Sequence, residues 1–385
     1  MPKEQIFEIK KQGKPEVPEK ETGPEIFWSP EATKEGEKLV KQISSLKQAL
    51  NQAEAEGDLK TQEKILDQID PLVKRLEILA EKETMLFEQL TQKELTKQYE
   101  FQKKIFEKAG ILEKLSTGEM VIKGIDNQNY TFPKMEEISK MMKENQEVLQ
   151  TKIEQGFQKL LIVPFGMKLD DLIERYKQVI LEHHKAGKLL ATKKDPSEPD
   201  EKLELDEKDP IYVWDKYKNA DTEGKLVYYP KEFSQENHQG KTKKEILEQT
   251  KQGFNILLIE DLPNIPREGK GEEVGGREQL EADKTPNEYL NALQDESIYQ
   301  NETGLTPEDQ LTYAILHLEQ TDQVIDDYSG HGSASYQLGA YFPASDDVPN
   351  AYWNRDDRQV YLHGYSPGYS GSDDGLRSAV KVLKS

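Results

Sequence analysis

The chain has 385 residues, of which 73 are acidic and 52 are basic, so its formal net charge is −21 at pH 7. This balance argues against a nucleic-acid binder, which needs a basic face to neutralise phosphates, and against adhesion to anionic membranes. The chain has no cysteine, which excludes disulfides and thiol chemistry. No apolar run approaches the roughly 20 residues that span a bilayer, and the first residues lack the apolar core of a secretory signal. We therefore expect a cytoplasmic protein of two or three domains without membrane insertion.

Residues 1–30 are rich in Lys, Glu and Pro and have little apolar content. That composition is typical of a disordered arm. Phe27-Trp28 is the exception, and it precedes a helix start signal at Ser29-Pro30-Glu31.

Residues 31–115 predict a helical hairpin. Apolar residues recur at three- and four-residue steps over 39–53 and again over 66–90, the latter run ending with Leu86 and Leu90. Glu56-Gly57-Asp58 ends the first helix and caps the second. A short loop between two such helices predicts an antiparallel coiled coil, and its apolar stripe favours self-association.

Residues 116–150 are expected to form a connector with a small hairpin around Met120-Val121-Ile122. Beyond it, the segments 154–162 and 250–259 echo each other: each follows a helical pattern, turns at a glycine and enters an apolar run of strand length. We predict that both are buried strands of one sheet.

The middle of the chain contains further helix and strand signals. Residues 168–187 predict an amphipathic helix, and Thr285-Pro286 and Thr306-Pro307 open two more. The run 336–342 predicts a strand that leads into the C-terminal segment.

Two strands, 211–214 and 225–229, flank a turn and predict a β-hairpin. Asp215, Asn219 and Asp221 lie between them, but their spacing does not fit a calcium loop and the terminal Glu of such a loop is missing. We expect no metal site here.

The last thirty or so residues, 353–385, differ in composition from the rest. Between 354 and 374 there is neither Lys nor Glu, although these two residue types dominate the charge elsewhere. Tyr, Ser, Gly, Asn and Asp, the residues of antibody-like binding surfaces, take their place. Residues 359–363 alternate as in a half-buried strand, and 377–382 predict a closing strand.

The missing residue types have an explanation at the nucleotide level. Random replacement of adenines in AAY codons produces NNY codons, which encode Tyr, Ser, Asp, Asn, Gly, His and Arg, among others, but never Lys, Glu, Gln, Met or Trp. Every residue from Asn354 to Asp374 except Gln359 is compatible with that set. The alternative is an ordinary surface loop rich in Tyr, Gly and Ser.

This segment resembles the variable region of diversity-generating retroelement target proteins, whose 3′ end is rewritten by a reverse transcriptase that errs at template adenines. The resemblance includes G-x-Y-F at 339–342, Y-W-x-R at 352–355 and G-x-R-x-A-V at 375–380. It is specific over 339–382 and weakens upstream.

The resemblance implies an α+β chain in which the helical hairpin is followed, over 151–385, by a C-type lectin-like domain related to formylglycine-generating enzymes. Its variable region would span about 353–374. It implies a non-enzymatic protein without cofactor, metal or catalytic residues, which binds a macromolecule such as a protein or a cell-surface component. The expected ligand-binding residues project from one solvent-facing surface: Asn354, Asp356, Asp357, Tyr361, His363, Tyr365, Ser366, Tyr369, Ser370, Ser372 and Asp373. The expected supporting core beneath them is Val360, Leu362, Leu376, Val380 and Val382.

Two other functions come from different classes of protein. One is a structural or adhesin-like assembly protein, of the kind found in phages, whose Tyr/Gly/Ser-rich tail packs against a partner subunit. The other, an enzyme of the formylglycine-generating type, is excluded because those enzymes work through cysteine. A near-copy of the DNA for residues 353–382, beside a reverse transcriptase gene, would distinguish diversification from assembly.

Overall fold

The structure is a computed structural model that describes the chain over 30–193, 197–295, 297–328, 330 and 332–382. The chain divides into two compact units, Met1–Leu86 and Phe87–Ser385. Helices and several sheets are both present, which confirms the α+β class. The predicted arm, including Phe27-Trp28, lies outside the described residues except for its last residue.

The first unit contains α2 (Pro30–Glu56) and the beginning of α3 (Leu59–Lys108), which continues into the second unit. Gly57 between them has a φ of 72°, a left-handed conformation that glycine adopts without strain. Asp58 caps α3, because its side chain accepts a hydrogen bond from the backbone N–H of Thr61 at 3.1 Å. The predicted stop and start signals are thus confirmed.

The two helices pack together near the ends that the turn connects. The cluster there comprises Ala53, Ile65 and Ile69, with Leu46, Leu50 and Val73 partly buried around it. Farther from the turn, Arg75 forms an ion pair with Glu35. Packing of the two helices against each other is confirmed for this part. The predicted hairpin extended to residue 115, but residues from Phe87 onward belong to the second unit, where Leu95 and Phe106 are part of the main core. The side chains of residues 80–91, including Leu86 and Leu90, lie outside the described part.

The second unit begins with the last part of α3 and a small antiparallel sheet. Its elements up to residue 154 are β1 (Glu113–Lys114), β2 (Met120–Lys123), β3 (Asn129–Thr131), α4 (Met135–Glu144) and α5 (Gln146–Glu154). Ile122, Ile138 and Leu149 belong to the main hydrophobic core. Residues 116–150, expected to be a connector, are therefore part of the compact unit, because their apolar side chains are buried in its core.

A four-stranded antiparallel sheet has the order β11-β17-β8-β4. Its strands are β4 (Lys159–Val163), β8 (Asn255–Ile259), β11 (Glu302–Gly304) and β17 (Ser378–Lys381). The two echoing segments supply β4 and β8, which pair directly from Lys159 opposite Ile259 to Val163 opposite Asn255. Both predictions, a shared sheet for the echo and a closing strand near 377–382, are confirmed.

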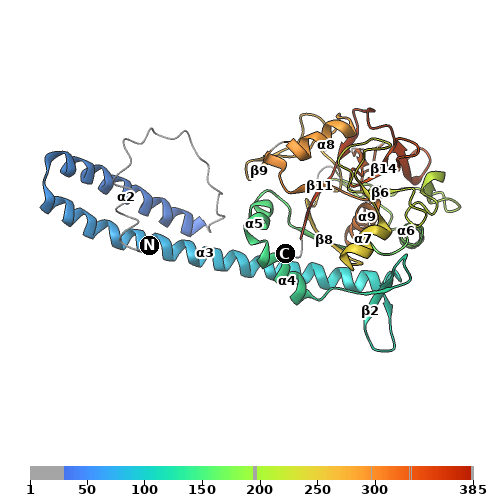
Figure 1. Ribbon diagram of the computed structural model, residues 1–385, viewed down its shortest axis with the longest axis horizontal. Helices are drawn as coiled ribbons and strands as arrows, with labels where there is room; N and C mark the ends of the chain where they lie inside the picture. The colour runs from blue at the N-terminus through green and yellow to red at the C-terminus, as the bar shows by residue number, and fades with distance from the viewer. Residues whose placement is uncertain (1–29, 194–196, 296, 329, 331, 383–385) are drawn as a thin grey trace. The chain divides into compact units, whose positions relative to one another are not determined.

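Four further helices belong to the same unit. They are α6 (Leu169–Lys185), α7 (Lys243–Thr250), α8 (Pro286–Asp295) and α9 (Pro307–Thr321), with short 3-10 helices at Asp215–Tyr217 and Ser297–Tyr299. Thr306 caps α9 as predicted, since its hydroxyl accepts from the Asp309 N–H at 3.2 Å. Helix α9 is buried over most of its length and contacts α6, β4 and β14 (Figure 1).

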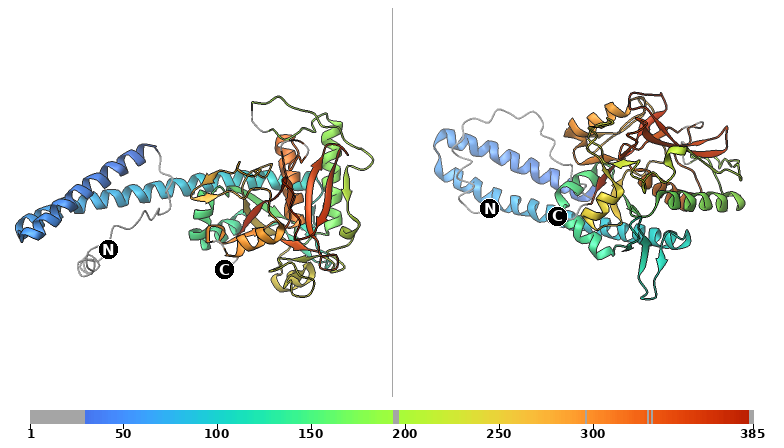
Figure 2. Two further views of the ribbon diagram at one scale, coloured as in Figure 1. Left: turned by 90° about the horizontal axis from the view of Figure 1, so that it is seen from above. Right: turned by 45° about the vertical axis from the view of Figure 1, so that its right-hand side comes forward.

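The second large sheet has the order β16-β12-β14-β15-β5. Its C-terminal strands are among the red strands of Figure 2. Its strands are β5 (Ile211–Val213), β12 (Ala334–Tyr336), β14 (Val348–Asn354), β15 (Gln359–Tyr365) and β16 (Asp374–Leu376). The β14–β15 hairpin is antiparallel, and β5 joins the outer side of β15 in parallel. β9 (Glu273–Val274) and β10 (Arg277–Glu278) pair with each other in a separate two-stranded sheet.

The predicted hairpin of 211–214 with 225–229 is wrong. Strand β5 pairs with β15, whereas β6 (Val227–Tyr228) pairs with β7 (Lys241–Thr242) and β13 (Ala340–Tyr341). The segment between β5 and β6 lies in the interior, since Tyr217 and Asp221 are buried. Long-range burial therefore outweighs the local turn.

The strand predicted over 336–342 is two strands in two sheets, β12 and β13. The chain turns between them because the backbone of Gly339 lies against Gly304 and Leu305. A Cβ at Gly339 would lie 2.6 Å from the Gly304 carbonyl oxygen, so only glycine fits there.

Candidate ligand-binding face

The β14–β15 hairpin has two chemically different faces. On the inner face Ala351 and Trp353 lie opposite Leu362 and Val360, and all are buried. They belong to the main core together with residues of α6 and α9. Leu376, Val380 and Val382 are buried as well, so the predicted burial of the five supporting residues is confirmed. Val380 and Val382 belong to the main core with Val360 and Leu362, whereas Leu376 belongs to a second cluster.

The outer face of the hairpin and of β5 carries aromatic side chains that contact one another in a continuous array. We call this array the aromatic face; it comprises Tyr212, Trp214, Tyr328, Tyr352, Tyr361, His363, Tyr365 and Tyr369. All of these residues are half-buried or exposed. Strand alternation explains the rings on β5, β14 and β15, since residues two apart share a face and residues paired across strands lie side by side. Tyr328 and Tyr369 join them from loops.

The centre of the aromatic face is built by stacking across strands. Tyr361 stacks on Tyr352 with ring centroids 5.2 Å apart and on Tyr212 with centroids 4.8 Å apart. His363 stacks on Trp214 at 5.2 Å. Such offset contacts add stability beyond the area they bury, so the rings hold one another in position.

One end of the face lies against a second hydrophobic cluster. Tyr365 stacks on Tyr369 at 5.0 Å and accepts a hydrogen bond from the hydroxyl of Tyr352. Tyr365 also packs against the cluster that Val348 and Tyr336 form with α8. It is therefore a half-buried boundary residue, less free than the projecting residue predicted from sequence, whereas Tyr369 is 46% exposed.

The turn between β14 and β15 holds three of the predicted ligand-binding residues. The Asn354 side-chain oxygen accepts hydrogen bonds from the N–H groups of Asp356 and Asp357 at 2.9 and 3.1 Å. The Tyr361 hydroxyl donates to Asp357 at 2.6 Å. This hydrogen bond, burial and the nearby Asp209 charge raise the pKa of Tyr361 to about 12. Asn354 thus organises the turn, and Asp356 and Asp357 are exposed at its surface.

The remaining predicted residues lie in the loop between β15 and β16. Ser366, Ser370 and Ser372 are exposed, and Asp373 forms an ion pair with Arg267 at 3.0 Å. None of the predicted ligand-binding residues, all of which are described, is buried.

The residues of the sequence motifs have a different environment. The buried carboxylate of Asp327 accepts two hydrogen bonds from Arg355, at 2.8 and 2.6 Å, and these raise the pKa of the guanidinium above its usual value. Arg377 is buried and pairs with the buried Asp326 at 3.0 Å. A Cβ at Gly375 would lie 2.7 Å from a methyl group of Ile265. The motif residues therefore hold the hairpin to the rest of the unit.

Sequence reasoning missed half of the aromatic face. Tyr212 and Trp214 lie in the segment 211–214, for which the sequence predicts pairing with 225–229. Tyr328 and Tyr352 precede the window of unusual composition. It also missed Asn350, which is fully buried opposite His363 with neither side-chain amide atom partnered within the described part of the chain. The tyrosines and tryptophan were visible as residue types, but only the strand pairing brings them together.

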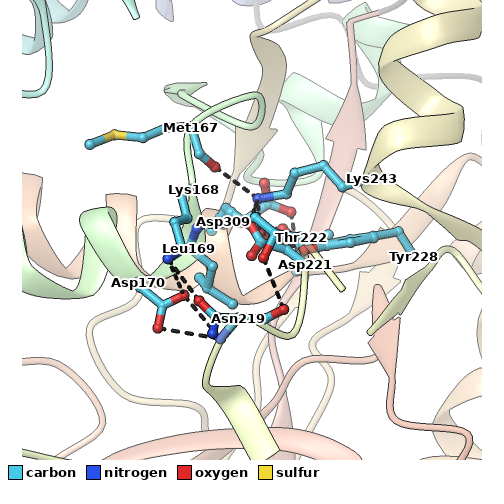
Figure 3. A network of polar contacts seen from close by, with 12 residues as sticks. Met167, Lys168, Leu169, Asp170, Asn219, Asp221, Thr222, Tyr228, Lys243 and Asp309 are labelled. Carbon is cyan, nitrogen blue, oxygen red and sulfur yellow. Dashed lines mark hydrogen bonds and ion pairs between the residues drawn. The ribbon is translucent and has the colours of Figure 1, made fainter. Parts of the chain in front are cut away.

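The segment with Asp215, Asn219 and Asp221 contributes to a buried ion network (Figure 3). The Lys243 ammonium contacts Asp221 at 2.6 Å, Glu308 at 2.7 Å and the Met167 carbonyl oxygen at 2.9 Å. Burial opposes this charge, but Glu308 and Asp221 outweigh it and raise the pKa of Lys243. A lysine thus supplies the positive charge at this point, and the network has a structural role.

No cluster of three or more His, Asp or Glu residues suited to a metal ion occurs among the described residues. Within the same ranges, no helix is long and apolar enough to cross a membrane. Comparison of the chain with family models, curated proteins and solved structures gave no match. The resemblance to retroelement target proteins therefore rests on the sequence motifs themselves.

Proposed function

We propose that this chain is a non-enzymatic binding protein with a C-type lectin-like domain, whose aromatic face is the surface that a retroelement diversifies. The observation that supports this most is the separation of two classes of residue within 353–382. The motif residues are buried or ion-paired, whereas the residues expected to vary lie at the surface.

Such a separation is what repeated diversification requires. Random replacement is tolerated only where a side chain contributes little to packing, since surface substitutions usually change stability by less than about 0.5 kcal/mol. Truncation of buried residues such as Leu362 costs several times more. A surface with free side chains on a fixed frame can therefore change its ligand without losing its fold.

The form of the face favours a macromolecular ligand. Its rings lie side by side on one sheet and form an extended array, and Tyr and Trp are the residues that most often anchor protein interfaces. We propose a protein or cell-surface component as the ligand and the cytoplasm as the compartment, with neither nucleic acid nor membrane as a partner.

The helical pair of the first unit is proposed to promote self-association as a coiled coil. Val40 and Ile78 are 49% and 65% exposed there, and self-association of the helices would cover such apolar side chains. Sedimentation of the full chain should show an oligomer that Val40→Lys with Ile78→Lys dissociates. A monomeric wild-type chain at micromolar concentration would contradict this part.

The test of the function uses two libraries of the full chain. In the first, NNY codons replace the predicted ligand-binding residues; in the second, they replace the buried Val360, Leu362, Leu376, Val380 and Val382. Most clones of the first library should resist protease like the parent, and most of the second should not. Selection of the first library against a panel of proteins should then yield binders.

Two outcomes would contradict the proposal. Equal protease sensitivity in both libraries would mean that the face is part of the packed structure. A folded first library that yields no binder to any protein would mean that the face does not bind ligands. Inspection of the encoding DNA for an adenine-bearing copy of the 353–382 segment tests the diversification independently.

A further inference from the structure

Half of the aromatic face lies outside the window that would be diversified. Tyr212 comes from β5 and Trp214 from the residue that follows this strand. Tyr328 comes from the loop before β12, and Tyr352 from β14 before the window begins at 353. On the proposed function, these four residues, which we call the constant rings, are the same in every diversified version of the chain.

The constant rings alternate in space with rings from the window. Tyr361 stands between Tyr212 and Tyr352, and His363 stacks on Trp214. Tyr328 contacts Tyr352 at 5.2 Å and is 39% exposed. Replacing a ring of the window by a smaller side chain would therefore uncover a constant ring and leave the face aromatic.

Three exposed carboxylates around the face have no ion-pair partner among the described residues. Asp356, Asp357 and Asp209 are exposed, and within the described ranges none forms an ion pair. Asp357 and Asp209 both act on Tyr361, the first through a hydrogen bond and the second through its charge.

Three arginines near the face are paired with carboxylates. Arg355 pairs with Asp327 and Glu201, Arg358 pairs with Glu204, and Arg267 pairs with Asp373.

Stacking covers both faces of Tyr361, but Tyr212 lies on the edge strand β5 and meets the rings of β15 from one side only. Tyr328 contacts Tyr352 alone among the described rings. These outer rings therefore offer a ring face with a negative quadrupole beside free carboxylates, and both attract cations. Among cations, guanidinium groups suit such a surface best. The flat side of a guanidinium stacks on an aromatic ring, while the N–H groups at its edge bind a carboxylate.

We infer that the aromatic face binds protein surfaces that present arginine side chains, and that the constant rings form an anchor for them shared by all versions of the face. The window would then select among basic ligands by shape and by its own hydrogen bonds. This inference rests on the proposed function and narrows the class of ligand.

The test is calorimetric titration of the full chain with a synthetic peptide of alternating Arg and Gly, compared with the matched Glu and Gly peptide. Work at about 0.15 M salt limits long-range attraction by the overall negative charge. The arginine peptide should bind at least tenfold more tightly than the glutamate peptide. Equal binding of the two peptides would overturn the inference.

The contribution of the rings is isolated by Tyr212→Ala with Tyr328→Ala, which changes no charge. Binding of the arginine peptide should weaken at least tenfold, while an unchanged melting temperature shows that the variant is folded. If the variant is destabilised, Tyr212→Leu, which keeps apolar area but removes the ring, replaces it. Unchanged affinity in a folded variant would refute the anchor.

The contribution of local charge is tested with Asp209→Asn and Asp357→Asn. Its matched control is Glu113→Gln with Glu119→Gln, exposed residues of the β1–β2 region that alter the net charge equally. The first pair should weaken binding several-fold more than the second. Equal losses of affinity in the two variants would show that binding depends only on net charge, and would refute a specific role of Asp209 and Asp357.

Failure here is distinguishable from failure of the proposed function. If the surface library folds and yields binders but the arginine peptide shows no preference for the face, only the choice of ligand is wrong. If the library clones do not fold, the diversified surface itself is wrong, whatever the peptide does.

Discussion

The two faces of the β14–β15 hairpin are made from alternate residues of the same strands, yet they serve different ends. On the inner face Trp353 is 1% exposed and Leu362 is 1% exposed, within the main core. On the outer face Tyr361 and His363 contact other rings and remain partly exposed. Because side chains alternate along a strand, stability and recognition can occupy one segment with little interference.

The arginines of the same region show the same contrast. Arg377 is buried with Asp326 and also donates to the backbone carbonyl of Leu262 at 2.9 Å. Arg358 is exposed and pairs at 3.4 Å with Glu204, which is itself exposed. Removing one partner of a buried pair leaves an uncompensated charge, whereas exposed pairs contribute little.

The largest effect should come from Arg377→Leu. It leaves the buried Asp326 without its cation, so we expect a loss of about 3–5 kcal/mol in the free energy of unfolding. Arg358→Leu is the matched control and should cost less than about 1 kcal/mol. Chemical denaturation of both variants checks this. Equal losses would remove the distinction between buried and exposed charges.

Leu362→Ala should destabilise the second unit by about 2–5 kcal/mol, as a truncation in a packed core. The measurement is the denaturation midpoint together with its slope. A loss below about 0.5 kcal/mol would show that the inner face is not tightly packed and would break the comparison between the faces.

Asp374, at the end of the window, is buried like the inner face, and it makes the stability of the fold depend on pH. Its carboxylate is buried beside Tyr336, and burial raises its pKa to about 6 from an ordinary value of 3.8. The folded state therefore holds the proton more tightly, so its stability falls as pH rises from about 4 to about 6.

Asp374→Asn should abolish that decline and exceed the wild type in stability by on the order of 2–3 kcal/mol at pH 7.5, since one pKa unit corresponds to about 1.4 kcal/mol. Below pH 4 the two chains should be alike. The check is denaturation at several pH values, and a difference that does not change with pH would contradict the assignment.

The smallest effect on stability should come from Tyr369→Ala. Its side chain is 46% exposed, so we expect a change within about 0.5 kcal/mol. Binding to the ligand of this chain should nevertheless weaken. The double change with Tyr365→Ala should cost more stability, because Tyr365 packs against the second cluster. Thermal melts and a binding titration of the same samples separate the two effects.

Elements that depend on neighbours in the sequence were predictable. The caps at Asp58 and Thr306 were visible as local patterns, and both form the expected hydrogen bonds. The alternation over 359–363 predicted which side chains are buried, because the strand period of two assigns alternate residues to opposite faces. Burial on the inner face followed from the same pattern.

Pairing between distant segments was not predictable. The partner of β5 is decided by the fit of Tyr212 on Tyr361 and of Ile211 opposite Val360, which lie far apart along the chain. The division of 336–342 into two strands depends on the close approach of Gly339 to Gly304. Neither contact leaves a local pattern, since each needs a surface that exists only after folding.

The sequence by itself determined the helical pair, the strands of the C-terminal segment and the side of each strand that is buried, because these depend on residue period and local capping. The tertiary structure alone decided that Tyr212, Trp214, Tyr328 and Tyr352 join the window residues in one aromatic face. It also decided that Lys243 sits between Asp221 and Glu308. Such groupings arise from the order of strands in a sheet and from the matching of buried charges, and both are properties of the packed chain rather than of any segment within it.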